Sequence, residues 1–264
     1  MIRYAMMSYT LMRQGCFTPA DCVRVARELE MPGIDWVTTY GEKPELLRKM
    51  SEDAGLAVAA HTFFIRPKDG ETVASLAERS LDDACTLGAP LVMIPPAPLP
   101  DVEPREENRK RWIDRLAEVA PLAEARGLVL TVENFPGERS PMVTAADFFE
   151  FKKAVPSLKL TFDNGNAASG EDQIASLQAC IGDVVHVHLK DWERLDPPPE
   201  GARRMLDGTY CRAALIGEGF VDSRATVREL EKAGYKGYIN IEYENNKYRA
   251  DEAVKRALEY LRAD

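Results

Sequence analysis

Histidine is scarce in this sequence, with only three among 264 residues, at positions 61, 186 and 188. Cysteine is also sparse: five cysteines are scattered over positions 16, 22, 85, 180 and 211, and none forms a CxxC pair. An odd and dispersed set of cysteines argues against a disulfide framework and predicts reduced thiols. We therefore expect a protein of the cytoplasm.

Long basic and long apolar stretches are missing as well. No block of Lys and Arg exceeds three residues and the formal net charge is −9, so binding to nucleic acid through its phosphates is not expected. No run approaches the roughly 18 apolar residues of a membrane helix. The opening MIRYAMMSYTLMRQGCF is interrupted by Arg3 and Arg13, which argues against a secretory signal. The composition predicts a soluble globular protein.

Short apolar runs alternate with longer helical patterns along the chain. Eight runs read as strands: 2–9, 33–40, 56–63, 90–96, 128–135, 158–165, 183–191 and 237–244. Eight stretches between and after them read as helices: 19–30, 43–55, 70–88, 105–127, 144–155, 171–182, 223–234 and 247–262. Glycines close several of these helices just before the next strand, as helix-stop signals do.

Eight alternating strand–helix units in a chain of this length predict an α/β fold, a (β/α)8 TIM barrel in a single domain over residues 1–264. A doubly wound open sheet is the alternative, but no GxGxxG follows the first strand. A long loop insertion is expected at about 192–222, after strand seven, and a proline-rich connection at 95–104. Both follow strands, so we expect them at the face where barrel enzymes carry their active sites.

Alternation within the later strands places polar side chains inside the barrel, because successive residues of a strand face opposite sides. On this pattern Glu133, Asp163, His188 and Glu242 point inward near the ends of four consecutive predicted strands. Three converging carboxylates would repel one another and lose hydration unless a cation neutralised them. The pattern therefore predicts a divalent metal site with these four residues as ligands. Three oxygen donors and one nitrogen favour Mn²⁺, Mg²⁺ or Co²⁺ over a structural zinc.

Three further residues face inward by the same alternation. His186 precedes His188 by one layer, and His61 lies in the third predicted strand. Each is either a substrate contact or a hydrogen-bonded structural histidine. Lys190 extends the inward face beyond His188 and either meets the substrate or forms a salt bridge with Asp191 or Glu193.

The pieces TVENF, TFDNGN, HVHLKDW and GEGFVDSRATVRELEKAGYKGYINIEYE resemble the xylose isomerase-like TIM barrel family. This family includes sugar isomerases, ketose 3-epimerases and inosose dehydratases. The resemblance implies that Glu133, Asp163, His188 and Glu242 hold one metal ion, and that Glu133 and Glu242 also act as the acid/base pair. It further suggests Arg194 as a substrate-binding residue. Many members carry a histidine where this sequence has Asn166, which can still hydrogen-bond a substrate hydroxyl but cannot carry a proton. The endonucleases of the same family need more histidines than this chain has.

These residues predict a divalent-metal-dependent sugar isomerase or epimerase that abstracts a proton next to a carbonyl through a metal-stabilised enediolate. The alternative is a dehydratase or β-eliminating lyase acting on a keto-sugar, an inosose or a 3-keto-glycoside. A further alternative is a barrel subunit without catalysis. We expect Mn²⁺ first among the ions, with Mg²⁺, Co²⁺ or Zn²⁺ as substitutes. The expected partner is a small sugar or cyclitol, and a homo-oligomer is compatible with the sequence.

Overall fold

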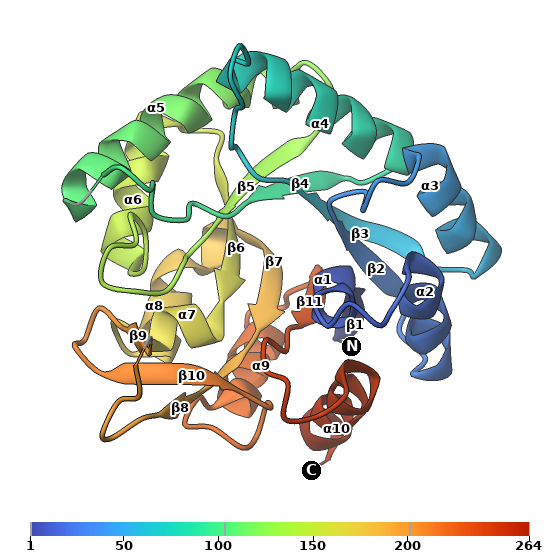
Figure 1. Ribbon diagram of the computed structural model, residues 1–264, viewed down its shortest axis with the longest axis vertical. Helices are drawn as coiled ribbons and strands as arrows, with labels where there is room; N and C mark the ends of the chain where they lie inside the picture. Colours follow the sequence, from blue (N-terminus) through green and yellow to red (C-terminus); the bar gives the residue numbers. More distant parts are fainter. Residues whose placement is uncertain (1, 103, 201, 264) are drawn as a thin grey trace.

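Eight parallel strands close into a barrel in the computed structural model, which describes residues 2–102, 104–200 and 202–263 (Figure 1). Around the barrel the order is β1-β11-β7-β6-β5-β4-β3-β2. The bounds are β1 Arg3–Met7, β2 Gly33–Val37, β3 Ala57–Thr62, β4 Leu91–Ile94, β5 Val129–Glu133, β6 Lys159–Asp163, β7 Val184–Leu189 and β11 Tyr238–Ile241. The predicted TIM barrel fold is confirmed.

Helices surround the barrel and alternate with its strands (Figure 1). Their bounds are α1 Ser8–Met12, α2 Pro19–Glu28, α3 Pro44–Asp53, α4 Val73–Leu87, α5 Arg105–Glu124, α6 Ala145–Ala154, α7 Asn164–Ala168, α8 Gln173–Cys180, α9 Ser223–Lys232 and α10 Ala250–Arg262, with a 3-10 turn η1 at Ile181–Asp183. Thr18, Thr72 and Thr144 begin three of these helices with reciprocal capping hydrogen bonds. The short helices α1 and α7 were not expected, and Ser8 and Tyr9 belong to α1 instead of the first strand.

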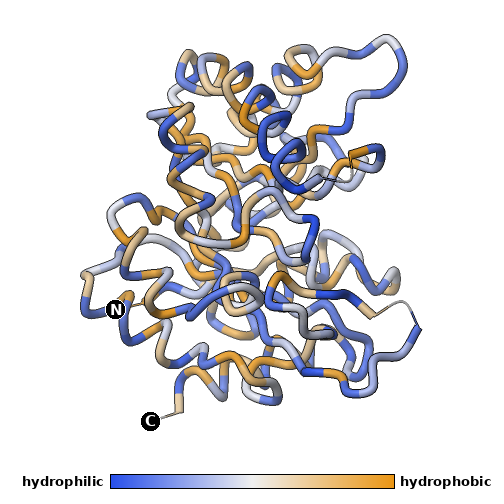
Figure 2. Tube along the Cα trace, turned by 90° about the vertical axis from the view of Figure 1, so that its left-hand side faces the viewer, coloured by the Kyte–Doolittle hydropathy of each residue, from blue (hydrophilic) through white to orange (hydrophobic). Residues whose placement is uncertain are grey.

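The hydrophobic core fills the space between the barrel and its helices. Ile34, Trp36, Val132 and Leu160 are buried on the outward side of their strands and belong to one cluster with helix residues such as Leu116. Figure 2 shows hydrophobic and hydrophilic stretches alternating along the helices, as expected when each helix buries one face. This core leaves the inner face of the strands free for polar residues.

The segment after β7 leaves the barrel as a small antiparallel sheet of three strands, in the order β8-β10-β9. These strands are β8 Asp191–Arg194, β9 Arg203–Arg204 and β10 Tyr210–Ala214, and the sequence pattern did not predict them. The Asp191 carboxylate holds the segment in place, because it accepts hydrogen bonds from the backbone N–H groups of Gly217, Gly219 and Val221.

Two irregularities in strand register decide which side chains face the barrel interior. Along β2 and β3 the partner of Ile34 is Val58 but the partner of Asp35 is Ala60, so one extra residue in β3 reverses its alternation. His61 consequently pairs with Trp36 on the helix-facing side, where its Nδ1 lies 2.8 Å from the Trp36 carbonyl oxygen. The prediction that His61 faces the interior is wrong. A similar shift in β7 falls before His186 and leaves the rest of that strand in register.

Within residues 2–102, 104–200 and 202–263, none of the helices combines the length and apolarity needed to span a membrane.

Candidate metal and substrate site

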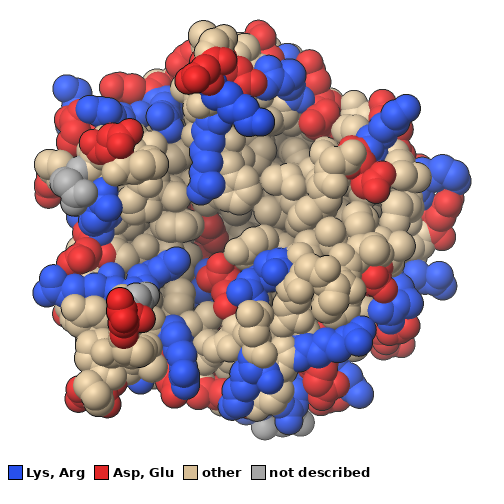
Figure 3. All heavy atoms as spheres, in the orientation of Figure 1, with Lys and Arg blue, Asp and Glu red and all other residues tan. Residues whose placement is uncertain are grey.

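The four predicted ligands converge where neighbouring barrel strands end. Glu133 and Asp163 are the last residues of β5 and β6, His188 is the fifth residue of β7, and Glu242 follows β11. One possible ligand atom from each lies within 4.8 Å of those from the other three, and all four side chains are buried. In Figure 3, acidic atoms are visible at the bottom of a central hollow, with Lys or Arg atoms beside them.

Distances within this cluster show which atoms are available to an ion. His188 Nδ1 lies 2.7 Å from Glu133 Oε1 and 3.5 Å from Glu242 Oε2. Asp163 Oδ1 accepts a hydrogen bond from the backbone N–H of Asn166, with an N···O distance of 2.7 Å. Its Oδ2, like Glu242 Oε2, is buried without a hydrogen-bond partner among the described residues. Such unsatisfied buried oxygens demand an explanation, and a bound cation is one.

Electrostatics in the cluster point the same way. Burial raises the pKa of Asp163 well above its usual range, and Lys190 only partly opposes this. Burial also raises the pKa of Glu133, despite the attraction of His188. For Glu242 burial is outweighed by Lys190 and His188, which hold its pKa below the usual range. Burial would lower the pKa of His188, but Glu133, Asp35 and Glu242 together raise it well above its usual value.

The donor set therefore suits a divalent cation. Three carboxylates and one imidazole are buried together, and among the described residues two of the carboxylate oxygens lack a hydrogen-bond partner. Lys190 and His188 are the cations that face these carboxylates. An ion would relieve both the repulsion and the missing hydrogen bonds. These four residues could hold one divalent metal ion.

Lys190 lies beside the cluster and its partners differ from those considered from the sequence. Its Nζ is 2.8 Å from Glu242 Oε1 and 2.9 Å from Glu244 Oε2. The partners expected from the sequence have other contacts. Asp191 accepts hydrogen bonds from backbone N–H groups, and Glu193 forms an ion pair with Arg212. The prediction of a salt bridge to Asp191 or Glu193 is wrong, since the chain turns at Lys190 and carries those residues into β8.

A cavity of about 350 Å³ opens over the cluster. Its lining includes Glu133, Lys190, Glu242 and Glu244. The remaining lining residues supply apolar surface and two guanidinium groups: Met7, Tyr9, Val37, Thr62, Phe64, Arg66, Met93, Pro95, Phe135, Pro136 and Arg203. Such a volume suits one small ligand. A larger hollow of about 900 Å³, lined by residues such as Ile2, Arg224 and Leu261, contains none of the four cluster residues.

Two residues predicted to bind substrate lie elsewhere. Arg194 is exposed on β8 with its guanidinium 4.3 Å from the Phe220 ring centroid, because β8 leads away from the barrel. Arg203, on β9, reaches the cavity instead. Asn166 donates from Nδ2 to the Asn134 carbonyl oxygen and is buried beside Asp163. In this position it supports the ends of β5 and β6.

His186 lies inside the barrel below His188, paired in register with Thr161. Sequence reasoning missed the residue that it meets, Asp35 of β2, whose Oδ2 lies 3.2 Å from His186 Nε2. An aspartate in the apolar run GIDWV was the available signal. Glu244 was missed as well, although it continues the inward alternation of Glu242.

A parallel barrel with a buried carboxylate–imidazole cluster at its strand ends is the class of protein that this fold and site define. The sequence profile described as xylose isomerase-like TIM barrel matches residues 23–264. The chain belongs to this family of enzymes.

Among sequence relatives, an inosose dehydratase of Geobacillus thermodenitrificans is 24% identical, over 93% of this chain and 87% of that protein. An inosose dehydratase of Clostridium perfringens strain ATCC 13124 is 28% identical over 59% of this chain and 52% of its own length. The second match is thus confined to about half of that relative.

Similar solved structures share the fold at low identity. A protein named IOLI with a bound zinc atom has a TM-score of 0.78 at 17% identity, covering 98% of this chain and 96% of that one. A probable 3-DHS dehydratase from Bacillus anthracis has a TM-score of 0.75 at 17% identity, with 98% of both chains covered. A 3-keto-D-glucoside 4-epimerase from E. coli has a TM-score of 0.75 at 18% identity, with 99% of both chains covered.

Proposed function

We propose that this protein is a divalent-metal-dependent dehydratase that removes water from a keto-sugar or a keto-cyclitol such as an inosose. The observation that carries the proposal is the meeting of acid and base groups in one cavity. Glu133 faces it from the end of β5, Lys190 from the end of β7 and Glu242 from the end of β11. The similarity to the inosose dehydratase of Geobacillus thermodenitrificans, which extends across most of both chains, supports this alternative over an isomerase or epimerase.

The metal would be held by oxygens of Glu133, Asp163 and Glu242 and by Nδ1 of His188. When bound, it supplies a positive charge that polarises a substrate carbonyl and acidifies the neighbouring C–H group. Mn²⁺ suits this donor set best, and Mg²⁺, Co²⁺ and Zn²⁺ are substitutes. The zinc atom in the IOLI structure supports a divalent ion but not its identity in this chain.

Two proton transfers by the chain's own residues complete a dehydration. Glu133 removes the proton from the carbon next to the carbonyl, and the electron pair of that C–H bond forms the new carbon–carbon double bond. The β-hydroxyl leaves with the electrons of its C–O bond and receives a proton from Lys190 Nζ, so that water departs. Lys190 is placed for this role because Glu242 and Glu244 hold its ammonium at the cavity wall.

Epimerisation is the second candidate, and the arrangement of the two glutamates favours it. Glu133 and Glu242 extend from strands separated by β6 and β7, so they could exchange protons on opposite faces of a substrate. Asn166 weighs against it, because it replaces the histidine of many epimerases and its amide is tied to Asn134. A barrel without catalysis is less compatible with a buried cluster of four such groups, two of which, Glu133 and Glu242, line a cavity.

Proton NMR in D₂O decides between the candidates. The protein is loaded with Mn²⁺, exchanged into Mg²⁺ to avoid line broadening, and incubated with inososes, ketoses, 3-keto-glycosides and 3-dehydroshikimate. If one compound loses water, the dehydratase proposal is supported. If a compound instead gains deuterium beside its carbonyl and keeps every carbon–oxygen bond, the protein is an epimerase and the dehydratase proposal is wrong. Glu133→Gln should lower kcat by about 10²–10⁴-fold. Glu138→Gln, at an exposed ion pair with Arg204, is the matched control and should retain activity.

A further inference from the structure

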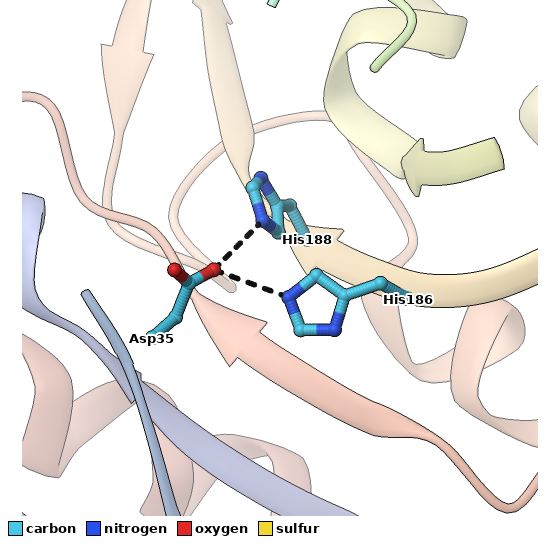
Figure 4. Close-up of side chains that lie close together, drawn as sticks. All are labelled: Asp35, His186 and His188. Atoms are coloured by element: carbon cyan, nitrogen blue, oxygen red, sulfur yellow. Dashed lines mark hydrogen bonds and ion pairs between the residues drawn. The ribbon is translucent and has the colours of Figure 1, made fainter. Parts of the chain in front are cut away.

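A second group of buried polar residues lies directly beneath the candidate metal site of Glu133, Asp163, His188 and Glu242 and faces His188 from below. It consists of Asp35, His186 and Asn240, which we term the lower layer. Asp35 Oδ2 accepts a hydrogen bond from Asn240 Nδ2 at 2.6 Å and lies 3.2 Å from His186 Nε2 and 3.8 Å from His188 Nε2. Figure 4 shows both imidazoles directed at this one oxygen. All of these side chains are essentially inaccessible to solvent.

The two nitrogens of the His188 ring therefore face different surroundings. Nδ1 is directed to Glu133 and Glu242, and Nε2 is directed to Asp35. Nε2 has no hydrogen-bond partner within the described part of the chain, and the carboxylate that it faces is Asp35, whose Oδ2 lies 3.8 Å away. Histidines that bind metals commonly present their second N–H to a carboxylate, which sets the tautomer and the direction of the ring.

The lower layer could in principle hold a second ion, since Asp35, His186 and His188 also offer atoms within 4.8 Å of one another. The amide of Asn240 argues against it. Its Nδ2 donates to the Asp35 oxygen that the two histidines face, and the same Nδ2 lies 3.1 Å from His186 Nε2. An N–H donor thus takes the position in which a cation would need to stand. The layer has the contacts of a hydrogen-bonded support.

We propose that Asp35 is a positioning residue, which keeps the proton of His188 on Nε2 and leaves Nδ1 to bind the catalytic ion, while Asn240 and His186 hold the Asp35 carboxylate in place. The inference rests on the metal site of the proposed function. Asp35 does not line the cavity, so its effect on substrate passes through His188. This role of Asp35 also gives a reason for the placement of two of the three histidines, His186 and His188, two residues apart on one strand.

The test uses the full chain labelled with ¹⁵N-histidine and loaded with Zn²⁺. Because there are three histidines, the variants His61→Gln and His186→Gln assign the spectrum. We expect zinc on His188 Nδ1 and a slowly exchanging proton on Nε2. In Asp35→Asn, which keeps the shape of the side chain, that proton should exchange faster and zinc affinity should fall by about 10–100-fold. His61→Gln, a buried histidine outside both clusters, is the matched control and should keep the wild-type affinity.

Several outcomes would overturn the inference: zinc bound to Nε2, two zinc ions per chain, or an Asp35→Asn variant with wild-type affinity and exchange. If Asp35→Asn does not fold, as judged from the thermal unfolding of the metal-free protein, the wild-type spectrum still decides through the site of zinc attachment. Turnover is scored separately. If Asp35→Asn weakens zinc as expected while no keto-sugar or cyclitol reacts with the wild type, the dehydratase proposal fails and the role of Asp35 stands.

Discussion

Lys190 Nζ lies 2.8 Å from Glu242 Oε1, so a buried ammonium and a buried carboxylate stand side by side at the wall of the cavity. Burial would lower the pKa of Lys190, but Glu242, Glu244 and Asp163 outweigh it and raise the pKa well above its usual value. Burial would raise the pKa of Glu242, but Lys190 and His188 together lower it. This contact places Lys190, the proposed proton donor to the departing hydroxyl, beside the candidate metal ligand Glu242.

Replacing Lys190 tests that assignment. Lys190→Met keeps the length of the side chain and removes the ammonium, so we expect kcat to fall by about 10²-fold or more, because a general acid contributes that much. Metal content, measured by atomic absorption, should stay at one ion per chain, since Lys190 is not a ligand. A variant with full activity and one bound ion would remove Lys190 from the mechanism.

Metal binding should release protons. The raised pKa values of Asp163, Glu133 and His188 mean that the metal-free fold holds protons that an ion must displace. Glu242, with its lowered pKa, is already ionised and contributes none. Apparent affinity should therefore increase with pH. Calorimetric titrations in two buffers of different ionisation enthalpy measure the release, and equal heats in both buffers would contradict it.

The same groups determine how the stability of the metal-free protein changes with pH. A carboxyl whose pKa is raised by folding binds more protons in the folded state than in the unfolded state. Asp163 and Glu133 therefore make the free energy of unfolding of the metal-free protein fall as the pH increases above the ordinary carboxyl pKa of about 4. The metal-loaded protein should lose this dependence. Urea unfolding at several pH values, with and without Mn²⁺, measures the difference.

Arg194 of β8 and Arg203 of β9 should differ in their effect on substrate. Arg203 lines the cavity, whereas Arg194 is directed at the Phe220 ring. A hydrogen bond to a charged group contributes about 1.5–3 kcal/mol, so Arg203→Ala should raise KM roughly 10-fold or more. Arg194→Ala serves as the matched control with an unchanged KM. Steady-state kinetics with the substrate found by NMR measures both, and the reverse order would restore Arg194 as the substrate residue.

Asp147 should be important for stability, far from the cavity. It is buried at the start of α6, accepts hydrogen bonds from the backbone of Val143 and Thr144, and pairs with Arg105 and Arg109 of α5. Asp147→Ala removes the carboxylate partner of Arg105 and one of the two carboxylates that pair with the buried Arg109, whose other partner is Glu150. The loss of these charged hydrogen bonds should cost about 1–3 kcal/mol. Urea unfolding is the measurement. Asp82→Ala, at an ion pair whose carboxylate is exposed, should change little.

Much of the architecture could be predicted because it follows from local patterns. Apolar runs of strand length alternate with amphipathic stretches, and only a few folds accommodate eight such units in one chain. The inward direction of Glu133, Asp163, His188 and Glu242 follows from the two-residue period of strands that are regular at those positions. The candidate ligand set could therefore be predicted before the strands were placed in space.

Tertiary structure alone decided the rest, because it depends on register and on contacts between distant segments. One extra residue in β3 turned His61 toward the helices, and periodicity cannot reveal such a shift. The antiparallel sheet after β7 carried Arg194 away from the cavity and Arg203 toward it. Asp35 reaches His188 across the barrel from a strand about 150 residues earlier. Local sequence determined which side chains face inward, and closure of the barrel determined which of them meet.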